Sequence, residues 1–149
     1  MTKTRIFLLS IAILAALAGL GFMGIRTLTQ KIYNARTCDW ANIDNIEMHA
    51  RIDIPEIESC ECEYDEIFNV KKSTFTLLAD MDPEEYIRKN KLEPLQGDFP
   101  RNVLAYAGNQ VLNQPKLFVR EGGRRDEERY EVLFDPSTRK LWIYLKYFN

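Results

Sequence analysis

Histidine is nearly absent from this sequence, which contains a single one, His49, in 149 residues. Histidine is the most frequent general base of enzymes, and a Ser–His or Cys–His catalytic pair requires one beside the nucleophile. The sequence also lacks a Gly-x-Ser-x-Gly nucleophile elbow and a glycine-rich phosphate-binding loop. We therefore predict no catalytic residue, no cofactor and no enzymatic activity. An enzyme that uses paired carboxylates is the one catalytic alternative left open.

Cysteine is also scarce, because the chain has only Cys38, Cys60 and Cys62. A structural zinc site needs about four ligands and a redox motif needs the spacing C-x-x-C, so we predict no metal site and no redox site. In an oxidising compartment we expect a disulfide from Cys38 to Cys60 or to Cys62, with one thiol left over. Three free thiols are the other interpretation, because spacing along the chain does not set the distance between cysteines.

Charged side chains are missing from residues 6–25, an apolar run with Lys3 and Arg5 before it and Arg26 after it. A helix of this length, at a rise of ~1.5 Å per residue, spans the roughly 30 Å hydrocarbon core of a bilayer. We predict that the run is an uncleaved, single-pass membrane anchor. The alternative is a secretory signal cleaved near Ala18, although such signals usually have an apolar region of only about 7 to 15 residues.

The basic residues on the two sides of the apolar run balance each other, so they do not set its orientation. A short N-terminal tail is easily left in the cytoplasm while a longer following segment is exported. We therefore predict a cytoplasmic tail at 1–5, the anchor at 6–25, a membrane-proximal helix and linker at 26–45, and one extracytoplasmic domain, periplasmic or extracellular, at 46–149. In the linker, Trp40 is interpreted either as an interfacial anchor or as a residue buried against the domain. No oligomeric state is predicted.

Basic residues are in the minority after the apolar run. Of the 20 Lys and Arg, three lie at or before residue 26, which leaves 17 against 22 Asp and Glu and a net charge of −5. Proteins that bind nucleic acid need a basic surface, so we predict no nucleic-acid partner. The acids concentrate between Arg51 and Lys71, where no basic residue occurs.

This acidic segment contains the candidate partner-binding residues, which are Glu58, Glu61, Glu63, Asp65 and Glu66. We predict that their carboxylates attract a basic protein partner. The alternative is a solvated sheet face that Lys71, Lys72 or the C-terminal bases neutralise across strands. Calcium binding is not supported, because the segment lacks the spacing of a calcium-binding loop.

Alternation of apolar and polar residues predicts strands at 46–54, 60–65, 68–77, 117–120, 129–134 and 140–148. Cys60, Cys62 and Tyr64 should share one face of their strand, which we predict to be the core face. Asp82 and Pro83 are favoured at a helix start, so we predict a helix that begins there and covers the aromatic sheet face. Residues 93–115 give no clear pattern.

These patterns predict an α+β protein, with an N-terminal transmembrane helix followed by a small antiparallel sheet and at least one packed helix. The function that fits best is a non-enzymatic protein-binding or inhibitor module, of the kind that immunity proteins provide. Two alternatives remain, a structural or accessory subunit of a cell-envelope complex and an enzyme that uses carboxylates.

Overall fold

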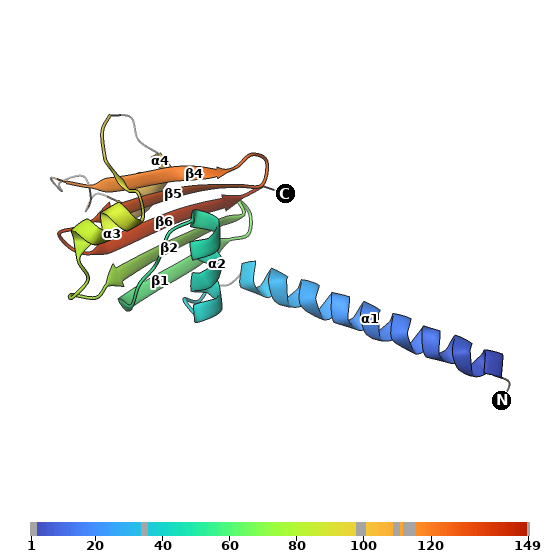
Figure 1. The fold of residues 1–149 in the computed structure, drawn as a ribbon. Helices are drawn as coiled ribbons and strands as arrows, with labels where there is room; N and C mark the ends of the chain where they lie inside the picture. The colour runs from blue at the N-terminus through green and yellow to red at the C-terminus, as the bar shows by residue number, and fades with distance from the viewer. Residues whose placement is uncertain (1–2, 34–35, 98–100, 109–110, 112–115, 149) are drawn as a thin grey trace. The chain divides into compact units, whose positions relative to one another are not determined.

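The computed structural model describes residues 3–33, 36–97, 101–108, 111 and 116–148, and the chain divides into two units, 1–34 and 35–149. The first unit contains one continuous helix, α1, Lys3–Tyr33 (Figure 1). Its segment Ile11–Thr29 has a mean hydropathy of 1.9 over 19 residues, and these values suit a membrane anchor or a signal sequence equally. The predicted apolar N-terminal helix is therefore confirmed.

The described part of the second unit is built on a six-stranded antiparallel sheet with the strand order β1-β2-β6-β5-β4-β3 (Figure 1). The strands are β1 Ile57–Asp65, β2 Val70–Leu77, β3 Glu93–Pro94, β4 Phe118–Arg124, β5 Glu128–Asp135 and β6 Lys140–Tyr147. β6 pairs with both β2 and β5, so it joins the β1–β2 hairpin to the rest of the sheet. The predicted α+β class and antiparallel sheet are confirmed.

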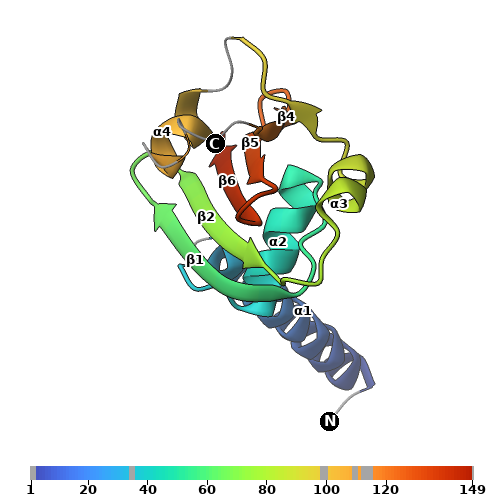
Figure 2. The ribbon, with the colours of Figure 1, turned by 90° about the vertical axis from the view of Figure 1, so that its left-hand side faces the viewer.

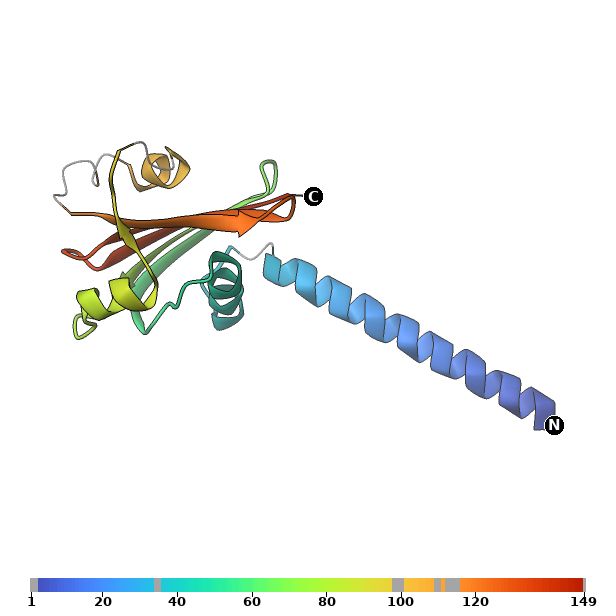
Figure 3. The same cartoon turned by 45° about the horizontal axis from the view of Figure 1, so that its top comes forward.

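The described residues of this unit also form three helices, α2 Trp40–Ala50, α3 Pro83–Lys89 and α4 Arg101–Ala107. α2 and α3 lie on one side of the sheet and α4 lies on the other, as two views show (Figure 2 and Figure 3). α2 contacts β4, β5 and β6, and α4 contacts β5 and β6. α3 begins as predicted, because the Asp82 side chain accepts hydrogen bonds from two backbone N–H groups of the first turn and Pro83 is the first helical residue.

The strand predicted at 46–54 is wrong, because this segment contains the second half of α2 and then an extended connection. The Asp39 side chain caps α2 by accepting a hydrogen bond of 2.9 Å from a backbone N–H in the first turn. Ile46 and Ala50 are buried and lie four residues apart, as one helix face requires, whereas Met48 between them is 66% exposed. Every second residue of the segment is apolar, and that alternation concealed the helical period.

The two sheet faces carry separate apolar contacts. On the face of α3, the rings of Tyr86 and Phe134 lie 4.9 Å apart. On the opposite face, Trp142 and Leu133 pack with Val103 of α4. The prediction that the helix beginning at Asp82 covers the face of Trp142 is therefore wrong, because α4 covers that face, from a region without a clear sequence pattern.

Candidate protein-binding edge

β1 is an edge strand of the described sheet, because β2 is its only neighbour there. Glu61 lies opposite Thr74 and Glu63 lies opposite Lys72 in this antiparallel pair. An edge strand presents backbone N–H and C=O groups that a further extended segment can pair with. The acidic segment therefore lies on the strand whose backbone N–H and C=O groups can pair with another strand.

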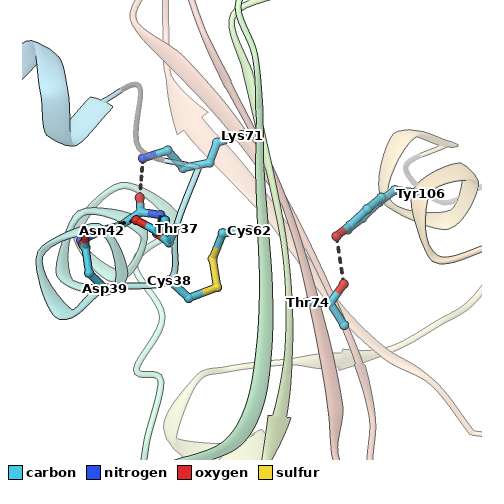
Figure 4. Close-up of a disulfide and its surroundings, with 8 residues drawn as sticks. All are labelled: Thr37, Cys38, Asp39, Asn42, Cys62, Lys71, Thr74 and Tyr106. Atoms are coloured by element: carbon cyan, nitrogen blue, oxygen red, sulfur yellow. Dashed lines mark hydrogen bonds between the residues drawn. A yellow bond between two sulfur atoms is a disulfide. The ribbon is translucent and has the colours of Figure 1, made fainter.

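Glu61 and Glu63 point to the sheet face that α4 covers. Their cross-strand partner Thr74 forms a hydrogen bond of 2.8 Å with the hydroxyl of Tyr106 in α4. Figure 4 shows Thr74 and Tyr106 on the side of the hairpin opposite to Cys62. Burial raises the pKa of the Tyr106 hydroxyl, the hydrogen bond with Thr74 partly offsets this, and the charges of Glu61 and Glu63 raise the pKa as well. The electrostatic field of these two carboxylates thus reaches the α4 side of the sheet.

Two of the predicted site residues have basic partners. Lys72 Nζ lies 3.8 Å from Glu63 Oε1, and Arg36 Nη2 lies 2.8 Å from Glu66 Oε1. The four groups are partly or largely exposed, so each pair contributes at most about 1 kcal/mol. The neutralisation predicted as the alternative therefore exists in part, through Lys72.

Glu58 and Glu61 are both exposed, and neither forms an ion pair with a described residue. The strand register shifts between Ile57 and Ser59, which places Glu58 at a bulge. Bulges occur often where an edge strand changes its pairing. The free carboxylates of the edge are therefore those of Glu58 and Glu61, with Glu63 weakly paired beside them.

Asp65 differs from the other four predicted residues, because its carboxylate serves the β1–β2 turn. Asp65 Oδ1 accepts hydrogen bonds from the backbone N–H groups of Ile67 at 3.0 Å and Phe68 at 3.1 Å. An aspartate in this position stabilises a turn through its side chain. The structure therefore brings Glu58, Glu61 and Glu63 together along β1, and it assigns Asp65 and Glu66 to the turn.

Cys38 and Cys62 form a disulfide with a Cα–Cα distance of 5.5 Å, and Cys60 is a free, exposed thiol (Figure 4). The disulfide joins the start of α2 to β1. The expectation that Cys60, Cys62 and Tyr64 all lie in the core is wrong for Cys60, while Cys62 is half-buried and Tyr64 is buried. The three residues share a face, but only the end near Tyr64 is well covered.

A buried polar cluster under α2 was not predicted. Lys71 Nζ, on a side chain that is 1% exposed, donates hydrogen bonds to Asn42 Oδ1 at 2.6 Å and Asn45 Oδ1 at 3.1 Å. The Tyr147 hydroxyl donates to Asn45 Oδ1 at 3.0 Å, and His49 contacts Glu128. Lys71 therefore does not neutralise the acidic segment. Adjacent strand residues point to opposite faces, so Lys71 and Lys72 have separate roles.

The stability of the domain should depend on the pH through Lys71. Burial lowers the pKa of the Lys71 ammonium to about 8 from 10.5, and Asp39 partly offsets this. Between pH 8 and about 10, the unfolded chain still binds the proton that the folded protein has released, so the free energy of unfolding should rise with pH. Urea unfolding across this window should show a smaller rise for Lys71→Met. Equal slopes for the two proteins would contradict the prediction.

The described residues contain no group of three or more His, Cys, Asp or Glu placed to hold a metal ion. No family model, curated protein or solved structure matches this chain. Its function is therefore inferred from its own residues and geometry.

Proposed function

We propose that the protein is a membrane-anchored, non-enzymatic binding module that uses the edge strand β1 to bind a basic, extended segment of another protein. The observation that carries this proposal is that, among the described residues, β1 has an unpaired edge and the carboxylates of Glu58 and Glu61 have no basic partner. A partner strand would gain backbone hydrogen bonds along β1, and its Lys or Arg side chains would gain attraction from the carboxylates. The backbone would provide affinity and the charges would select the partner.

We further propose that α1 stays uncleaved as a single-pass anchor and that the sheet domain lies on the extracytoplasmic side. The apolar segment Ile11–Thr29 supports the anchor, since it is long enough to span a bilayer. The Cys38–Cys62 disulfide supports the extracytoplasmic side, because disulfides persist in oxidising compartments. Helix α2, which contacts three strands and is joined to β1 by this disulfide, is proposed as the packed helix that holds the sheet rigid.

Photocrosslinking in intact cells tests the binding edge. A benzoylphenylalanine replacing Glu61 in the full chain should form a defined crosslinked product with one other protein. Changing Glu58 and Glu63 to Lys should reduce the yield of this product about tenfold, the effect of about 1.4 kcal/mol of lost attraction. The matched control changes Glu84 and Glu85, two exposed acids of α3, to Lys and should leave the yield unchanged.

Two outcomes would contradict this function. A crosslinked product that is insensitive to the reversal of Glu58 and Glu63 would show that the carboxylates do not select the partner. The same set of products from a probe at position 84 would show that β1 is not a preferred surface.

A further inference from the structure

Large apolar side chains are exposed at one end of the sheet. Ile67 is 87% exposed and Phe68 is 65% exposed, both in the β1–β2 turn. Phe148, which follows β6, is 43% exposed. The backbone N–H of Tyr147 donates a hydrogen bond of 3.0 Å to the carbonyl of Asn69, so the end of β6 lies beside this turn. These three apolar residues, Ile67, Phe68 and Phe148, are named the apolar tip.

Charges of both signs surround the apolar tip. The basic residues at this end of the sheet are Arg36, Arg124, Arg125, Arg129 and Lys146, and the acidic ones are Asp65, Glu66, Asp126, Glu127 and Glu128. Lys146 Nζ lies 5.6 Å from the ring centre of Phe148. Because the signs balance, this end has no basic surface of the kind that binds anionic lipid through charge. Contact through the apolar side chains is the stronger contribution.

Covalent continuity limits the distance of the apolar tip from any membrane that α1 spans. The ion pair of Arg36 with Glu66 holds residue 36 on the β1–β2 turn. Tyr33 ends α1, and the three residue steps from Tyr33 to Arg36 span at most roughly 11 Å. The part of α1 from Arg26 to Tyr33 adds roughly 10 Å of helix. At full extension these two stretches add to roughly 21 Å between Arg26 and Arg36, and the side chains of Arg36 and Glu66 add to the distance of the turn, so the chain length sets only an upper limit.

We infer that Ile67, Phe68 and Phe148 insert into the interfacial layer of the membrane that holds α1. This inference rests on the proposed anchoring of α1. Aromatic and aliphatic side chains have a lower free energy at the boundary between headgroups and acyl chains than in water. The tether limits how far the apolar tip can move from that boundary, so insertion costs less freedom than it would for an untethered domain. The membrane surface would then fix the orientation of the domain, with β1 held at a set height above the bilayer.

Fluorescence quenching by brominated lipid tests the inference on the full chain. In a Trp40→Phe background, Phe68→Trp is reconstituted into phosphatidylcholine vesicles with or without brominated acyl chains. The fluorescence that Phe68→Trp adds to that of Trp142 should be quenched in the brominated vesicles. The matched control, Ala79→Trp, is at an exposed position just beyond the opposite end of β2 and should keep its emission. Trp142 remains as the common background signal. Because the charges at the tip balance, quenching should not require anionic lipid.

The outcomes separate this inference from the proposed anchoring. If the protein floats with the vesicles but Phe68→Trp is quenched no more than Ala79→Trp, the apolar tip does not insert and the anchoring of α1 stands. If the tryptophan at position 68 has a blue-shifted emission without quenching, protein covers the tip, and the lipid contact is overturned. If the full chain does not float with the vesicles, the anchoring and the inference both fail.

Discussion

Replacement of Trp142 by Ala is expected to lower the free energy of unfolding of the sheet domain by about 3 to 5 kcal/mol. Trp142 is 7% exposed and packs against Val103, Val119 and Leu133. Removing its indole would leave a cavity between α4 and the sheet, and the loss combines the transfer free energy with the cost of that cavity. Urea unfolding, followed by circular dichroism so that the signal does not depend on tryptophan, measures the change.

Trp40→Ala is the matched control, because Trp40 is the only other tryptophan and its side chain is 76% exposed. Surface substitutions of this kind change the free energy of unfolding by about 0.5 kcal/mol or less. Equal losses for the two substitutions would mean that α4 and the face of Trp142 do not form a core. The interpretation that buries Trp40 against the domain is wrong, because its side chain is exposed, and a small loss on Trp40→Ala is therefore expected.

Reduction of the Cys38–Cys62 disulfide is expected to lower the free energy of unfolding by about 3.5 kcal/mol. The two cysteines are 24 residues apart, and the crosslink stabilises the fold mainly by limiting the unfolded chain over that loop. Cys38→Ser should reproduce the effect of reduction, whereas Cys60→Ser should leave the stability unchanged, because Cys60 is free and exposed. Equal stability of Cys38→Ser and the unchanged protein would contradict the prediction.

A thiol reagent provides a separate measurement of the same pairing. The folded, unreduced protein should take up label at Cys60 alone, and all three cysteines should react after reduction and unfolding. Labelling of Cys62 without reduction would show that the disulfide is not formed.

Local sequence signals were sufficient for β1, β2, β4, β5, β6 and α3, but they missed β3 and predicted a strand at 46–54 that does not exist. The alternation around Cys60 and Cys62 corresponds to β1, and the pair Asp82 and Pro83 begins α3. α2 was missed because Ile46 and Ala50 fit a strand period and a helix period equally well, and only the cap at Asp39 distinguishes the two. This cap lies within 26–45, the segment that the sequence predicts to be a membrane-proximal helix and linker.

The sequence was sufficient to find the acidic residues of the candidate site, but it did not predict the structural role of each residue. A run of acids is visible in the sequence, and the edge position of β1 depends on the distant pairing of β2 with β6. The turn function of Asp65 depends on the backbone of Ile67 and Phe68, which no periodicity reveals. The burial of Lys71 depends on Asn42 and Asn45, and these face the sheet only because residues 40–50 are helical.

The position of β6 has a consequence for the biogenesis of the protein. β6 lies in the middle of the sheet, yet Lys140–Tyr147 is the last of the described strands to leave the ribosome. Until then, the β1–β2 hairpin has no partner for β2, and β5 has none on its inner side. Pairing β2 with β6 closes a loop of about 60 residues, which is slow compared with forming a hairpin. The described sheet is thus completed only after Lys140–Tyr147 has been synthesised.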